Sequence, residues 1–245
     1  MANILILGDT WGITPCHEWP RNSLLVNWFE FQFLKRGHAT FNRSWGGNQN
    51  HNQLNIASVF LHAVENTPFK IDLVIWFHSE LLRDFAAEPP YGNINNTIEE
   101  IGFDNLINRT AERVYGTVNE MRKRFPETKW AIIGGHAPLH SPRKNLLDWA
   151  EFRIDNWRAE ISGKFCPDSQ CMEWLDPTKG SLYDWPAVGE EIIKREQAIR
   201  EILLEATTDF DLFHNGKNPS QKVYESLAKR IIEHFNLDNE IKGRS

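Results

Sequence analysis

The chain begins with a short apolar run that stops abruptly at a glycine. Residues 3–7 read Asn-Ile-Leu-Ile-Leu, and Gly8, Asp9 and Thr10 follow at once. A run of this length, bounded by a turn signal, predicts a strand that is buried on both faces, as in the centre of a parallel α/β sheet. Such sheets carry their functional groups at the carboxyl ends of the strands. Taken alone, Gly8-Asp9 is equally compatible with an ordinary turn, because both residues are common in turns.

Further strand patterns alternate with helical patterns along the chain. We expect strands at residues 39–42, 71–77 and 129–135. Amphipathic stretches predict helices at residues 22–37, 54–64, from 97 or 105 to 125, 188–206 and 219–235. Strands that alternate with helices in this way predict a parallel sheet with right-handed crossovers and helices on both faces, a three-layer α/β/α sandwich. The loops that follow the strands then open on one edge of the sheet.

Residues 140–185 have the least regular pattern. They suggest helical pieces within 146–161, a strand at 171–175 and a loop before Pro186. Nothing in the pattern indicates a boundary, and 245 residues suffice for one large α/β core. We therefore expect a single domain over residues 1–245.

Charge and composition exclude several classes of function. The net charge is −6 with both signs interspersed, which argues against duplex nucleic acid as the main partner. Three cysteines are too few for a disulfide framework. No stretch is typical of a secretory signal or a membrane span, so we expect a soluble, cytoplasmic protein with no membrane partner.

The sequence offers no strong cofactor or metal motif. His136 and His140 are four residues apart, but Pro138 between them breaks the helix that would place both on one face. Cys166 and Cys171 have no second pair to complete a zinc site. The phosphate-binding and dinucleotide-binding glycine patterns are missing. We expect neither a metal nor a cofactor.

Four polar segments occur in an order that resembles the SGNH (GDSL-like) hydrolases, a family of esterases and lipases with a flavodoxin-like α/β/α fold. The segments are Gly8-Asp9-Thr10, Asn42 to Gln49, His78-Ser79-Glu80, and Asp211-Leu212-Phe213-His214. The resemblance covers nearly the whole chain. Each segment alone is a weak signal, but four in the correct order, three of them after expected strands, are moderately specific.

The resemblance implies a role for five residues. Thr10 stands where the family has its nucleophilic serine, and His214 with Asp211 matches the base and its orienting carboxylate. Gly47 stands where the family uses a backbone N–H to bind the oxyanion, and Ser79 replaces the oxyanion asparagine. In acyl transfer His214 would take the proton of the Thr10 hydroxyl, which is otherwise too weakly acidic to attack a carbonyl.

Two departures from the family pattern keep a second interpretation open. The β-methyl of Thr10 restricts its rotamers and crowds the attacked carbonyl, and Ser79 has a shorter reach than asparagine. The first interpretation is a hydrolase of small-molecule or carbohydrate O-acyl esters, with Trp11 and Trp45 available to stack on a sugar. The alternative is a catalytically impaired protein that binds a carbohydrate or acylated ligand without cleaving it.

Overall fold

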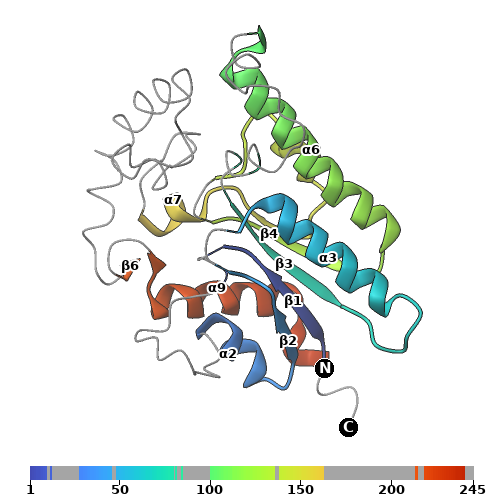
Figure 1. Cartoon of the computed structure of the whole chain (residues 1–245). Helices are drawn as coiled ribbons and strands as arrows, with labels where there is room; N and C mark the ends of the chain where they lie inside the picture. Colours follow the sequence, from blue (N-terminus) through green and yellow to red (C-terminus); the bar gives the residue numbers. More distant parts are fainter. Residues whose placement is uncertain are drawn as a thin grey trace.

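A five-stranded parallel sheet forms the centre of the molecule. The computed structural model describes residues 1–9, 12, 28–45, 48–79, 81, 84, 100–135, 138–162, 213–214 and 218–240. Its sheet has the order β2-β1-β3-β4-β5, and every neighbouring pair is parallel (Figure 1). The strands are β1 (Asn3–Leu7), β2 (Ala39–Asn42), β3 (Leu73–His78), β4 (Lys129–Gly134) and β5 (Phe152–Ile154). This is the parallel α/β sheet that the sequence predicts.

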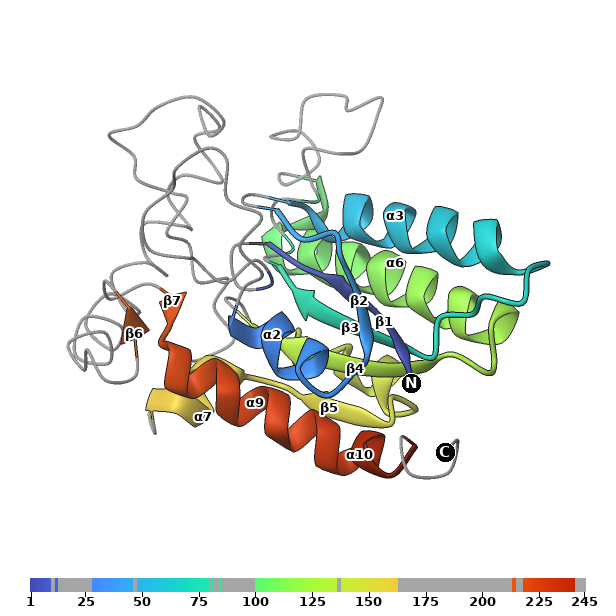
Figure 2. The same ribbon diagram turned by 90° about the horizontal axis from the view of Figure 1, so that it is seen from below.

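Helices cover both faces of the sheet, as Figures 1 and 2 show. One face carries α3 (Asn50–Val64) and α6 (Phe103–Arg124). The opposite face carries α2 (Trp28–Leu34), α7 (Trp157–Ser162), α9 (Gln221–His234) and α10 (Leu237–Glu240). A short 3-10 helix, η1 (Lys144–Leu147), precedes β5. The described residues therefore form the expected three-layer α/β/α arrangement.

Strand β1 shows why these strands read as unbroken apolar runs. Leu5 and Leu7 point into the core beneath α3 and α6, whereas Ile4 and Ile6 belong to the core beneath α2 and α9. Successive side chains of a strand point to opposite faces, so a strand between two helical layers buries every residue. Two cores thus share one sheet.

An aromatic cluster joins the second helical layer to the sheet. The ring centroid of Phe29 on α2 lies 5.2 Å from that of Phe33 and 5.3 Å from that of Phe77 on β3. Tyr224 on α9 contacts both Phe29, at 6.3 Å, and Trp157 on α7, at 5.4 Å. Edge-on aromatic pairs at these separations add to the energy of burial. The cluster fixes three helices to the centre of the sheet.

Some predicted boundaries differ from the structure. Helix α3 begins at Asn50, four residues before the predicted start at Leu54. Within 146–161 the prediction of helical pieces is wrong at residues 152–154, which form the edge strand β5. A strand of three residues is too short to show an alternating pattern, which explains the error. Residues 22–27, 171–175 and 188–206 lie outside the described part of the chain, and the single domain over 1–245 stays a prediction.

Among the described helices, none is both long and apolar enough to cross a bilayer.

Candidate active site

The parallel register brings the loops after β1, β2 and β3, where three of the four predicted site segments begin, to one edge of the sheet. Ile6 of β1 is paired with Asn42 of β2, and Leu7 is paired with Trp76 of β3. The chain beyond these residues continues on the same side, because all the strands point in one direction. The N–H of Trp45 donates to the carbonyl of Gly8 at 3.2 Å, so the loop after β2 is bonded to the end of β1.

Most of the predicted catalytic residues lie outside the described part of the chain. These are Thr10, Gly47 and Asp211. The backbone of His214 is described: it ends strand β6 (Phe213–His214), which pairs antiparallel with β7 (Asn218–Pro219). Figure 2 shows β7 and the beginning of α9 on the side of the molecule to which the carboxyl ends of the sheet strands point. The roles of Thr10, His214 and Asp211 stay predictions.

Described neighbours of the two predicted catalytic segments nevertheless lie within electrostatic range of each other. Asp9, which precedes Thr10, and Tyr224, in the first turn of α9, are both fully buried. Burial raises the pKa of the Tyr224 hydroxyl well above its ordinary value, and the negative charge of Asp9 raises it further. Charges act in this way only over short distances. The end of β1 at Asp9 therefore lies within electrostatic range of the first turn of α9.

The raised pKa of Tyr224 predicts a loss of stability in alkali. An unfolded tyrosine loses its proton near pH 10, whereas the folded protein keeps the Tyr224 proton to higher pH. Above about pH 10 the folded state binds more protons, so the free energy of unfolding falls by at most about 1.4 kcal/mol per pH unit from this residue. Urea unfolding at several pH values above 9 should show that the free energy of unfolding declines less steeply with pH in Tyr224→Phe than in the wild-type protein. Equal slopes in both proteins would contradict the prediction.

A buried polar network holds the loops after β2 and β3 together. The Ser79 hydroxyl donates to the Asn48 carbonyl at 3.0 Å and accepts from Gln53 Nε2 at 2.8 Å. Gln53 Nε2 also donates to the Asn48 carbonyl at 3.1 Å, and Gln53 Oε1 accepts from Trp76 Nε1 at 2.8 Å. A hydroxyl has a single hydrogen to donate. Ser79 could serve an oxyanion, as the sequence predicts, only by giving up its bond to Asn48.

A second set of bonds ties Ser79 to the beginning of α3. Asn50 Nδ2 donates to the Ser79 carbonyl at 2.9 Å and to Asp84 Oδ2 at 2.8 Å, while Asn50 Oδ1 accepts from the Ser79 N–H at 2.8 Å. The other oxygen of Asp84 accepts from the His51 N–H at 2.8 Å. A carboxylate is favourable at the positive end of a helix. Burial lowers the pKa of Arg113, an effect that Asp84 opposes.

Two glycines allow the loop after β1 to pack closely. A Cβ on Gly8 would lie 2.9 Å from the Cβ of Phe77, and one on Gly12 would lie 2.3 Å from Ser44 Oγ. The Gly12 N–H donates to the Asp9 carbonyl at 3.1 Å, and Asn42 Nδ2 donates to the Gly12 carbonyl at 3.1 Å. These bonds fold the loop back onto the segment that follows β2.

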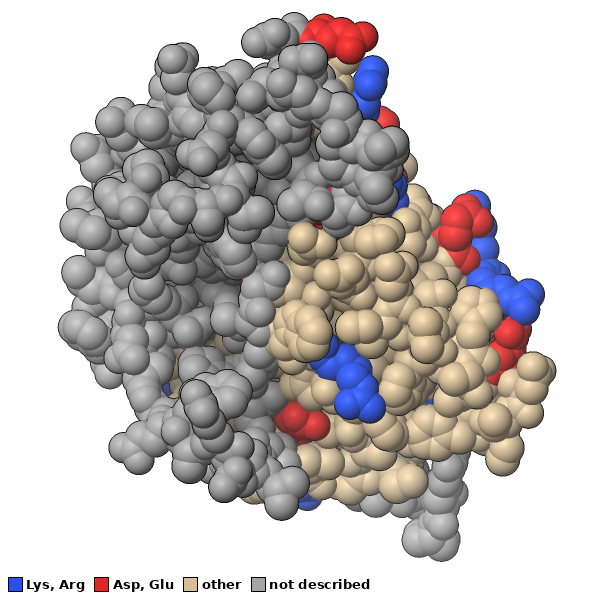
Figure 3. Space-filling model, in the orientation of Figure 1, with Lys and Arg blue, Asp and Glu red and all other residues tan. Residues whose placement is uncertain are grey.

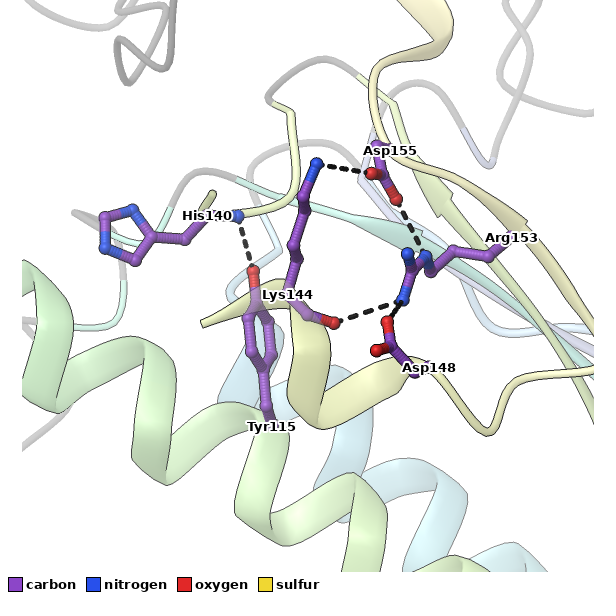
Figure 4. Close-up of polar contacts among 6 residues, drawn as sticks. All are labelled: Tyr115, His140, Lys144, Asp148, Arg153 and Asp155. Carbon is purple, nitrogen blue, oxygen red and sulfur yellow. Dashed lines mark hydrogen bonds and ion pairs between the residues drawn. The ribbon is translucent and has the colours of Figure 1, made fainter. Parts of the chain in front are cut away.

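The loop after β4 is held by a separate group of polar contacts (Figure 4). The His140 N–H donates to the Tyr115 hydroxyl at 2.8 Å, and Lys144 pairs with Asp155 at 2.7 Å. Arg153 pairs with Asp155 at 2.8 Å and with Asp148 at 2.5 Å, as the dashed lines of Figure 4 show. These contacts join the loop to α6 and β5.

His136 and His140, the pair that the sequence disfavours as metal ligands, are only partly described. His140 Nε2 lies 2.8 Å from Asn108 Oδ1, and His136 lies outside the described part of the chain. Among the residues that the structure describes, no three His, Cys, Asp or Glu side chains gather as metal ligands.

The sequence analysis missed the buried carboxamides of this edge. Asn48, Asn50 and Gln53 are all at most 1% exposed, although they follow a polar loop that reads as solvent-exposed. The close spacing of Asn and Gln residues directly after the glycines of that loop is a signal that could have indicated buried carboxamides. Asp84, also fully buried, lies between the strand and the helix that the sequence predicts at residues 71–77 and from 97 or 105.

The face of the molecule shown in Figure 3 carries charges of both signs. Figure 3 shows that most of the described surface there is uncharged, with basic and acidic side chains next to one another at its right-hand margin. Described ion pairs of this kind include Arg124 with Glu65 and Lys123 with Glu120. The described part of this face therefore has no broad field of one sign.

Comparison with known proteins finds similarity only among solved structures. No family model matches the sequence, and no curated protein matches it. A member of the lipolytic G-D-S-L family from Veillonella parvula aligns over 96% of this chain and 99% of its own, with 12% identity and a TM-score of 0.43. The psychrotrophic esterase EstA of Pseudoalteromonas aligns over 84% and 100%, with 13% identity and a TM-score of 0.42.

A catalytic mutant of an acetylxylan esterase from Geobacillus stearothermophilus aligns over 95% of this chain and 93% of its own, with 13% identity and a TM-score of 0.42. The chain is thus similar to GDSL-like lipases and esterases, at low identity throughout. A reaction for this chain has to be argued from its own residues.

Proposed function

We propose that this protein is an ester hydrolase of the SGNH type, with Thr10 as nucleophile, His214 as general base and Asp211 as the residue that orients His214. The observation that carries the proposal is the position of α9 beside the end of β1: Tyr224 belongs to the same buried core as Ile6 and lies within electrostatic range of Asp9. It brings the first strand and the last long helix together at the edge where parallel α/β sheets hold their ligands. Thr10 directly follows Asp9 in the sequence, and His214 lies seven residues before Gln221, the first residue of α9.

The proposed reaction is acyl transfer in two steps. His214 removes the proton of the Thr10 hydroxyl as the oxygen attacks the ester carbonyl, and the protonated imidazole then gives that proton to the departing alcohol. Water cleaves the resulting acyl-threonine with His214 again acting as base. The backbone N–H groups of Thr10 and Gly47 are proposed to stabilise the oxyanion, each donor being worth roughly 3 to 4 kcal/mol.

We propose carbohydrate O-acyl esters as a substrate class to be tested first. Trp45 is 61% exposed on the loop after β2, and its backbone N–H is bonded to Gly8 at the end of β1. An exposed aromatic ring beside such an edge offers a flat apolar surface with a polar rim, which suits a sugar ring. If the substrate is a sugar ester, Trp45→Ala should raise KM for an acetylated oligosaccharide more than for a small aryl ester.

Substitution of Thr10 tests the proposal directly. Thr10→Ala should reduce hydrolysis of short-chain aryl esters to the background rate, because the attacking oxygen is removed. Thr10→Ser should keep or increase the rate, since serine has the hydroxyl without the β-methyl that restricts threonine. Release of the chromogenic alcohol measures both. A protein whose activity is indifferent to Thr10→Ala would instead be a binder that has lost hydrolysis, or would use another nucleophile.

A further inference from the structure

Asn48 has a buried side-chain amide without a described role in the fold. The residue is 1% exposed, and among the described residues neither Nδ2 nor Oδ1 has a hydrogen-bond partner. Buried polar atoms in native proteins are nearly always paired, so an unpaired carboxamide needs an explanation. The neighbouring carboxamides of Asn50 and Gln53 differ, because both are bonded at each end.

The backbone of Asn48 is fixed from two sides. Its carbonyl accepts bonds from the Ser79 hydroxyl and from Gln53 Nε2, which secure it to the end of β3 and to α3. Its N–H donates to the Trp45 carbonyl at 3.2 Å, and the Trp45 N–H donates in turn to the Gly8 carbonyl. Asn48 therefore sits in a network that joins the ends of β1 and β3, directly after Gly47.

We propose that Nδ2 of Asn48 donates a hydrogen bond to the oxyanion of the ester substrate, beside the backbone N–H groups of Thr10 and Gly47. This inference rests on the proposed function. As the Thr10 oxygen bonds to the ester carbon, the carbon–oxygen π electrons move onto the carbonyl oxygen, while the hydroxyl proton passes to His214. When the tetrahedral intermediate collapses, the ester C–O bond breaks and the alcohol takes that proton.

The geometry favours Asn48 over Ser79 for this role. The Ser79 hydrogen is already donated to the Asn48 carbonyl, whereas the Asn48 amide has two hydrogens and no described acceptor. The bonds to the Asn48 backbone fix where its side chain begins, and burial shields the amide from water, which strengthens a hydrogen bond to a charge that develops on the substrate. In this arrangement Ser79 is a positioning residue that holds the Asn48 backbone in place.

The experiment compares Asn48→Ala and Asn48→Asp with the wild-type protein on a short-chain aryl ester. Asn48→Ala should lower kcat by about 10²- to 10³-fold, the loss typical of one oxyanion donor, with little change in KM. Asn48→Asp should lose at least as much, because a carboxylate cannot donate and repels the oxyanion. The matched control is Asn55→Ala, an exposed residue of α3 whose described side-chain bond is to His51, and it should keep full activity.

Thermal unfolding separates this role from a structural one. Asn48→Ala should unfold at the same temperature as the wild type or higher, because it removes a buried amide that has no described bond. Gln53→Ala should unfold at a lower temperature, because it leaves Trp76 Nε1 without its acceptor.

Each remaining outcome overturns the inference in a recognisable way. An active wild type with an unimpaired Asn48→Ala variant would refute the role of Asn48 and leave the proposed function intact. A loss of activity accompanied by a large fall in the unfolding temperature would show that the amide supports the fold. A wild-type protein that does not hydrolyse esters would refute the proposed function, and this inference with it.

Discussion

Replacement of His214 by alanine should lower kcat/KM for ester hydrolysis by about 10⁶-fold or to the background rate, which is the scale of loss when the histidine of a catalytic triad is removed. Without the imidazole nothing takes the proton from Thr10, whose hydroxyl is a poor nucleophile at neutral pH. Asp211→Asn should also lower the rate strongly, because the base loses the carboxylate that orients it. The measurement is the initial rate with an aryl ester over a range of substrate concentrations.

The control for His214 is His62, an exposed histidine of α3. His62 lies in the last turn of α3, and its described contacts are with Ser58 and Phe125. His62→Ala should leave kcat/KM unchanged. This result would show that the loss in His214→Ala does not follow from removing any imidazole. Substantial hydrolysis by His214→Ala would show that the base is a different residue, and the proposed assignment would then be wrong.

Replacement of Phe29 by alanine should destabilise the protein by about 3 to 5 kcal/mol, the usual cost of removing a fully buried phenylalanine. Phe29 has no exposed surface and contacts Phe33, Phe77 and Tyr224, so its loss leaves a cavity between α2, β3 and α9. In a chain of this size we expect the midpoint of thermal unfolding to fall by roughly 10 °C.

Phe31 provides the matched control for Phe29. It lies on the same helix, two residues further on, but it is 51% exposed and its described ring contact is with the Lys35 ammonium at 5.8 Å. Phe31→Ala should cost under about 1 kcal/mol. Calorimetry or urea unfolding of both variants measures the difference. Equal losses of stability in the two variants would mean that the contacts of Phe29 in the aromatic cluster contribute little to the free energy of unfolding.

The fold was predictable where both faces of an element are buried. The unbroken apolar runs of β1, β3 and β4 predict central strands, and the structure places them there because helices cover both sides. Strand β5 was missed, since a three-residue edge strand leaves no periodic pattern. The early start of α3 was missed for a different reason: Asn50 and Gln53 are polar, and their burial depends on partners from β3 and its loop.

The candidate site was only partly predictable for the same reason. Gly8-Asp9-Thr10 follows an apolar strand, so its position at the sheet edge can be inferred from the sequence. The closeness of Asp9 to Tyr224 cannot be inferred in this way, because a tyrosine on the apolar face of a helix predicts burial and does not indicate which charge lies near it. Likewise, the engagement of the Ser79 hydroxyl with Asn48 is a tertiary contact that has no local sequence signature.

The packing of α9 beside the end of β1 has a consequence for folding during protein synthesis. A nascent chain can pair all five sheet strands before residues 211–234 have left the ribosome, since β5 ends at Ile154. On the proposed assignment such a chain would possess its nucleophile but lack its base. Hydrolytic competence would then arrive only after α9 has left the ribosome, so activity would report that this helix has docked on the sheet.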